Sequence, residues 1–149
     1  MNRKDDRFKQ GIYKPMSNKY KGKSYPKYRS SWELKFFRWC DLNPNILEWN
    51  SENVIIPYRI GQGKPRRYIV DNTLVIRTGG VNKKYLVEIK PYAQTQPPKP
   101  HGNKKRTTVL YEQYTYAKNR SKWLAAKQWC KAKGYEFIII TERELFNKR

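Results

Sequence analysis

Asp71, Glu88 and Lys90 are the residues whose types and spacing suit the hydrolysis of a phosphodiester bond. Asp71 ends one apolar stretch, and Glu88 and Lys90 lie at the end of the next, residues 84–90. Because side chains alternate across a strand, Glu88 and Lys90 should point to the same face. If the two stretches pair as a hairpin, Asp71 and Glu88 come within the distance that one metal ion can bridge.

Two carboxylates beside a lysine suit a hard divalent cation and an attacking water. Mg²⁺ prefers oxygen ligands, keeps several waters and neutralises charge on a scissile phosphate. The Lys90 ammonium can orient the water or stabilise the transition state. The set predicts a Mg²⁺-dependent phosphodiester hydrolase, with Mn²⁺ expected to substitute. The alternative is structural, because a Glu-x-Lys strand is commonly a solvated face with a cross-strand ion pair.

Composition favours a nucleic acid as the partner. The 149 residues contain 33 Lys and Arg against 12 Asp and Glu, a formal net charge of +21. Charge so one-sided destabilises a compact chain unless a polyanion offsets it. No apolar run approaches the roughly 20 residues of a membrane span, and no membrane partner is expected. The candidate DNA contacts are Arg66, Arg67, Lys104, Lys105, Arg106, Lys19, Lys21 and Lys23.

Two of these basic groups have competing interpretations. Lys104, Lys105 and Arg106 join a long loop to a helix start, where helix-terminal amides would help them clamp a phosphate beside the site. A solvated charge run is the alternative. Residues 1–29 are basic and rich in tyrosine without strand or helix periodicity, so they are expected to be an extended arm that orders on DNA or on a capsid protein, or a solubilising tail.

The remaining chain, residues 30–149, is expected to be one α/β domain with a mixed central sheet flanked by helices. Ser30 and Glu33 form a capping-box pattern that opens a helix to about Leu42. The pattern then predicts four strands, a long loop, a long helix ended by Gly134, a further strand and a short last helix. The four strands are expected at residues 54–58, 67–70, 73–77 and 84–90, and the loop at 91–106. The long helix is expected at 107–133, the further strand at 135–140 and the last helix from 141 onward.

An Asp followed 17 residues later (88 − 71) by Glu-Ile-Lys at a strand end resembles the PD-(D/E)XK nuclease superfamily. Val70 stands where that family usually has a proline. The resemblance implies a restriction-endonuclease-like fold, with Asp71 and Glu88 as metal ligands and Lys90 as a catalytic residue. It also places Glu33 at the position of a metal-binding and catalytic glutamate on the first helix, although a capping role alone would explain that residue. Gln113 is the candidate for a helix glutamine found in some branches.

The segments 28–33, 55–58 and 86–91 narrow the resemblance to TnsA-type endonucleases, over about residues 20–140. Within that group the short basic chain is similar to head-completion nucleases of T4-like tailed bacteriophages. This implies an endonuclease that acts on packaged DNA ends before tail attachment, with portal or neck proteins as partners. It also implies a place in the host cytoplasm during assembly, or in the virion.

Two other functions remain open from the sequence. A non-catalytic DNA-binding component of the phage head would keep the charge but has no need of the carboxylate–lysine set. An RNA-binding protein would suit the charge and the tyrosines, but the chain has neither an RNP1 strand nor a Gly-x-x-Gly loop.

Overall fold

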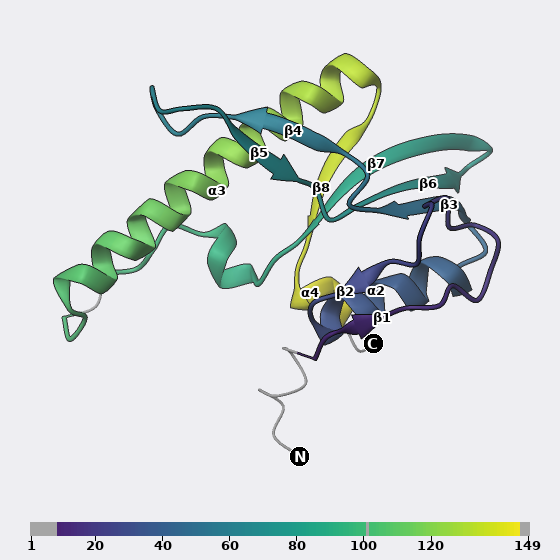
Figure 1. Ribbon diagram of the computed structural model, residues 1–149, viewed down its shortest axis with the longest axis horizontal. Helices are drawn as coiled ribbons and strands as arrows, with labels where there is room; N and C mark the ends of the chain where they lie inside the picture. The colour runs from purple at the N-terminus through teal and green to yellow at the C-terminus, as the bar shows by residue number, and fades with distance from the viewer. Residues whose placement is uncertain (1–8, 101, 147–149) are drawn as a thin grey trace.

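The computed structural model describes residues 9–100 and 102–146, and a four-stranded sheet forms its centre (Figure 1). The strand order is β3-β6-β7-β8, with β3 (Ile46–Ser51), β6 (Asn72–Thr78), β7 (Val81–Ile89) and β8 (Glu136–Ile140). The first three strands are antiparallel to their neighbours, whereas β8 joins β7 in parallel. The predicted mixed α/β sheet flanked by helices is therefore confirmed.

The helix α2 (Ser31–Leu42) covers one face of this sheet. Its Phe36 and Phe37 are buried against Trp49 of β3 and Leu74 of β6. Val87 of β7 points into the same core. The helix begins as predicted, because the Ser30 hydroxyl accepts a hydrogen bond from the Glu33 amide at 3.2 Å.

The long helix α3 (Arg106–Lys133) and a separate hairpin cover the other face (Figure 1). The hairpin pairs β4 (Ile55–Tyr58) with β5 (Arg66–Ile69) and does not belong to the central sheet. Pro57 lacks an N–H and suits a strand that has no further neighbour. Leu86, next to Val87, packs with Ala126 of α3 on this face, as strand alternation requires.

The buried residues of α3 run from Asn119, at the middle of the helix, to Cys130 near its C-terminal end. Its N-terminal half extends beyond the sheet and faces the segment 91–105, which contains the short helix η1 (Tyr92–Thr95) (Figure 1). The last helix, α4 (Glu142–Leu145), was predicted from residue 141 onward, and a capping box between Thr141 and Glu144 opens it. Within the described residues, no helix is both long and apolar enough to cross a membrane.

The strand β3 was not predicted, and a β-bulge explains why. The register against β6 shifts between Ile46 and Glu48. An extra residue in a strand breaks the two-residue alternation, so Ile46 and Trp49 both point into the core although they are three positions apart. The sequence pattern therefore lacked the periodicity of a strand.

Residues 1–29 were expected to be an extended arm. Residues 1–8 lie outside the described residues, whereas residues 9–29 pack onto the domain. The strands β1 (Gly11–Ile12) and β2 (Lys27–Tyr28) pair with each other, and Tyr13 is buried against Phe37. The amine of Lys19 donates to the backbone carbonyls of Asp41 and Asn43 at the end of α2, at 3.2 and 2.7 Å. These hydrogen bonds give Lys19 a structural role. The division of the chain into an arm and a domain at residue 29 stays a prediction.

The buried carboxylate of Asp41 organises this packing. It accepts hydrogen bonds from the Tyr13 hydroxyl (2.6 Å), the Met16 amide (2.8 Å), the Ser17 hydroxyl (2.6 Å) and the Trp49 indole (3.0 Å). Burial alone would raise the pKa of the Asp41 carboxyl, but these hydrogen bonds outweigh it and hold the pKa below its usual value.

Replacing Asp41 should therefore destabilise the fold. Asp41→Ala leaves buried donors unpaired and should lower the free energy of unfolding by about 3 kcal/mol. Since the pKa in the folded state is the lower one, the stabilisation is complete above the unfolded value of about 3.9 and is lost as pH falls through the folded value. Urea unfolding followed by tryptophan fluorescence at several pH values measures both effects. Glu136→Ala, an exposed change on β8, is the control. Equal stability of the two variants would contradict the role assigned to Asp41.

Candidate active site

Asp71 lies at the point where β5 passes into β6, one residue before the paired ladder begins. Its Oδ2 accepts a hydrogen bond from the backbone amide of Ile89 at 2.8 Å. The ladder pairs Asn72 with Val87, so Asp71 comes next to Glu88. The backbone carbonyl of Asp71 also accepts from the Glu52 amide at 3.0 Å. The stretch that Asp71 ends, β5, pairs with β4 and not with β7, so the hairpin forms between β7 and the strand that follows Asp71, β6. Its register still brings the two carboxylates next to each other.

Glu88 is buried, with a side chain that is only 7% exposed. The hydroxyl of Tyr68 on β5 donates a hydrogen bond to its Oε2. Its Oε1 lies 3.5 Å from the Nζ atom of Lys90. Glu88 in β7 and Lys90 directly after it thus lie on one face of the sheet, the face that β5 and α3 cover.

The pKa of the Asp71 carboxyl is raised well above its usual value, first by burial and then by the negative charge of Glu88. The hydrogen bond from Ile89 and the charge of Lys90 act in the opposite direction but are weaker. Two carboxylates held together in this way repel each other. A bound cation would remove that repulsion.

A second lysine, Lys122 on α3, faces the same carboxylates. Its Nζ lies 5.3 Å from the ring centre of Tyr68 and 6.0 Å from that of Tyr58. Burial lowers the pKa of Lys122, with Lys118 and Lys90 acting in the same direction, while Glu88 opposes them. Lys122 is therefore a partly desolvated cation beside the site.

Glu33 lies near the pair but is not joined to it. Its Oε2 accepts from the Arg29 amide at 3.4 Å, instead of from the Ser30 amide that a complete capping box requires. Burial raises the pKa of the Glu33 carboxyl, and the charges of Glu52 and Glu88 contribute to the rise. Glu52, whose backbone has a φ of 53°, forms an ion pair with Arg29.

The donor set fits a small hard cation. Among the described residues no three Asp, Glu, His or Cys side chains gather closely enough to hold a metal ion. Two carboxylates are nevertheless enough for Mg²⁺, which keeps several waters and takes further oxygens from a phosphate. Asp71 and Glu88 are the residues that would hold the ion, and Lys90, 3.5 Å from Glu88 Oε1, would lie beside it.

The candidate DNA contacts are placed at different distances from this site. Arg66 and Arg67 are exposed on β5, directly before Tyr68. Arg106 begins α3, 16 residues before Lys122, so it lies about 24 Å from it along the helix axis. The Lys104 ammonium forms an ion pair with Glu112 at 2.7 Å, while Lys105 is exposed. The cluster of residues 104–106 is therefore not beside the carboxylates.

Of the other candidates, Lys21 and Lys23 are exposed in the segment packed on the α2 side of the domain. Gln113 is exposed as well. It precedes Lys122 by nine residues, which turns it by about 180° to the opposite side of α3. The structure does not bring Gln113 to the carboxylates.

Tyr68 and Lys122 are the site residues that sequence reasoning missed. Tyr68 is buried between the exposed Arg67 and Ile69, and nothing in the strand pattern indicated that its hydroxyl would contact Glu88. Lys122 precedes the buried Ala126 by one helical turn. A lysine one turn before a buried alanine, beside the buried stripe of the helix, could have indicated that its side chain faces the site.

Neutralising one carboxylate should stabilise the metal-free protein. Asp71→Asn removes the repulsion with Glu88 and should raise the free energy of unfolding in EDTA by about 1 kcal/mol. Millimolar Mg²⁺ should raise the Tm of the wild-type chain but not that of the variant. Thermal unfolding followed by circular dichroism measures both quantities, with the exposed Glu48→Gln as control. A variant less stable than the wild type would mean that the pair is not repulsive.

Comparisons with known proteins identify the family of the chain. Residues 43–142 match the family model described as the N-terminal part of TnsA-like endonucleases. The chain is also 42% identical over 134 residues to the head completion nuclease of Enterobacteria phage T4, an alignment that covers 84% of this chain and 85% of that protein. The matched region contains Asp71, Glu88, Lys90 and Lys122. The chain therefore belongs to the TnsA-like endonuclease family within the PD-(D/E)XK nucleases.

Proposed function

We propose that this chain is a Mg²⁺-dependent DNA endonuclease that acts on packaged DNA ends during phage head completion, before tail attachment. The observation that carries the proposal is the pairing of Asp71 and Glu88 beside Lys90. Membership of an endonuclease family and the net charge of +21 support it. The head-completion role rests on the similarity to the phage T4 protein.

The chain's own residues divide the work at the scissile phosphate. Asp71 and Glu88 would hold the ion, which when bound neutralises phosphate charge and lowers the pKa of a water. Tyr68 positions Glu88 through its hydroxyl, so that the carboxylate keeps one orientation. Lys90, whose side chain is 21% exposed, can reach the attacking water or the phosphate.

Lys122 supplies a second positive charge from the side of α3. Its position over the Tyr68 ring places it across from β7, so that Lys90 and Lys122 approach a phosphate from two elements. A cation that is already partly desolvated needs little reorganisation when charge develops on the phosphate. Glu33 supports the site through its charge, and its service as a further metal ligand stays a prediction.

The partners that this proposal includes are DNA and the portal or neck proteins of the phage. Arg66, Arg67 and Lys105 are exposed and suited to phosphate contacts. The work would take place in the host cytoplasm during assembly, or in the virion. Mn²⁺ is expected to replace Mg²⁺, because both accept oxygen ligands.

Replacing a carboxylate should separate cleavage from binding. Glu88→Gln should abolish cleavage of plasmid and branched DNA in Mg²⁺, because one of two metal ligands loses its charge. Affinity for DNA should be equal or higher, since a charge that repels phosphate is removed. Gel assays with Mg²⁺, Mn²⁺ and EDTA, and anisotropy for binding, give the two readouts. Wild-type cleavage by Glu88→Gln would refute the assigned site. A wild-type chain that binds but never cleaves would favour a structural DNA-binding component.

Removing either lysine should slow cleavage more than it weakens binding. Lys90→Ala and Lys122→Met should each lower the single-turnover rate at saturating DNA by on the order of 10²-fold. Lys127→Met is the matched control, because Lys127 is exposed on another face of α3. If a lysine variant had the wild-type rate once DNA was saturating, that lysine would be a phosphate contact only.

A further inference from the structure

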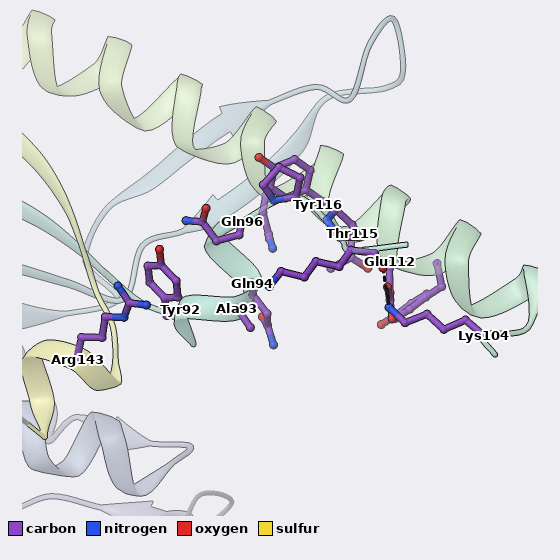
Figure 2. Close-up of a pocket in the computed structure, with 14 residues that line it drawn as sticks. Tyr92, Ala93, Gln94, Gln96, Lys104, Glu112, Thr115, Tyr116 and Arg143 are labelled. Carbon is purple, nitrogen blue, oxygen red and sulfur yellow. Dashed lines mark hydrogen bonds and ion pairs between the residues drawn. The ribbon is translucent and has the colours of Figure 1, made fainter. Parts of the chain in front are cut away.

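A groove of about 820 Å³ lies between residues 92–99 and the N-terminal half of α3, with Lys104 also in its lining (Figure 2). One wall consists of residues 92–99, including η1. The other wall is the face of α3 that carries Glu112, Thr115, Tyr116 and Asn119. None of these residues belongs to the carboxylate site described above.

Both walls of the groove come from segments that also carry a lysine of the active site. On one wall Tyr92 follows Lys90 with only Pro91 between them. On the other, Asn119 precedes Lys122 by three residues, so the two lie about 4.5 Å apart along the axis of α3. A nucleic-acid strand with a phosphate between Lys90 and Lys122 would enter this groove when it continues toward the N-terminus of α3.

The lining combines flat aromatic rings with hydrogen-bonding amides. Tyr92, Tyr111 and Tyr116 contribute the rings, and Tyr111 is 70% exposed on α3. The guanidinium carbon of Arg143 lies 3.4 Å from the ring centre of Tyr92. Figure 2 shows the two side chains together at one end of the groove. Gln94, Gln96 and the buried Asn119 contribute side-chain amides.

The charge of the groove suits an anion. Lys99, Lys104 and Arg143 line it, and Glu112 is its acidic residue. Glu112 and Lys104 form an ion pair (Figure 2), so their charges offset each other, and Lys99 and Arg143 supply the net positive charge of the lining. Rings for stacking, cations for the backbone and amides for base edges are together the features that bind single-stranded nucleic acid.

We propose that this groove binds the unpaired bases of a DNA strand that continues from the scissile phosphate. The proposal rests on the proposed nuclease function and names its substrate class: duplex DNA with a single-stranded segment at the cleavage point. A duplex stacks its bases on one another and presents only their edges in its grooves. Unpaired bases can instead insert between tyrosine rings.

The dimensions agree with a short segment. From Tyr111 to Asn119 the helix rises by about 12 Å, that is eight residues at 1.5 Å each. At the roughly 3.4 Å that stacked nucleotides occupy along a strand, about three fit. A cavity of about 820 Å³ is within the range of pockets that enclose small ligands, roughly 300–1,000 Å³.

Binding measured without metal tests the groove independently of cleavage. In EDTA, fluorescence anisotropy compares a blunt duplex with the same duplex carrying an oligothymidylate tail. The wild-type chain should prefer the tailed duplex. Tyr111→Ala and Tyr116→Ala should each weaken binding of the tailed duplex on the order of tenfold and leave the blunt duplex unchanged. Tyr116→Phe keeps the ring and should behave as the wild type.

Tyr114→Ala is the matched control, because Tyr114 is 45% exposed on the same helix but does not line the groove. Should Tyr116→Ala fail to fold, the exposed Tyr111 carries the test alone. If the folded Tyr111→Ala and Tyr116→Ala variants bound the tailed duplex with wild-type affinity, the proposal would be overturned. Equal losses for both duplexes would also overturn it.

The outcome is separable from that of the nuclease proposal. Glu88→Gln should bind the tailed duplex at least as well as the wild type, since Glu88 does not line the groove. If the wild-type chain cleaved DNA but the tyrosine variants bound the tailed duplex as well as the wild type, the nuclease proposal would hold and the groove proposal would fail. If the wild-type chain preferred the tailed duplex but cleaved no DNA in Mg²⁺, the groove proposal would hold and the nuclease proposal would fail.

Discussion

The structure must offset the repulsion between two carboxylates that lie next to each other at the buried end of one hairpin. Asp71 and Glu88 raise each other's electrostatic energy, and little water reaches Glu88. Neighbouring groups offset this repulsion. The end of β7 provides the Ile89 amide, and Lys90 follows it directly. The Tyr68 hydroxyl comes from β5, and Lys122 comes from α3. The separate hairpin β4–β5, which the central sheet does not need, is what brings the tyrosine to Glu88.

The central part of this arrangement could be predicted because it depends on local geometry. Strand alternation alone places Glu88 and Lys90 on one face, and their 3.5 Å contact confirms it. A short turn between two apolar stretches predicts the hairpin that pairs Asn72 with Val87 and so aligns Asp71 with Glu88. The ends of α2 and α4 were predictable for the same reason, because their capping residues are neighbours in the sequence.

The parts that escaped prediction depend on contacts between distant residues. Tyr68 and Glu88 are 20 positions apart, and Tyr13 meets Asp41 across 28. No periodicity in residues 9–29 indicates that one tyrosine and one serine anchor the segment to α2. The groove beside α3 could not be predicted from the sequence for another reason. Its wall comes from a segment without regular pattern, whose position is set by packing rather than by propensity.

The parallel strand β8 also determines when the site can form during synthesis. The backbone amide of Lys90 donates to the Ile140 carbonyl at 3.0 Å, and Glu88 pairs with Ile139. A parallel pair needs a crossover, here the whole of α3, so β7 lacks this neighbour until residue 140 has left the ribosome. Most of the positive charge emerges earlier. The nascent chain can therefore attract nucleic acid through its charge before it has the geometry to cut it.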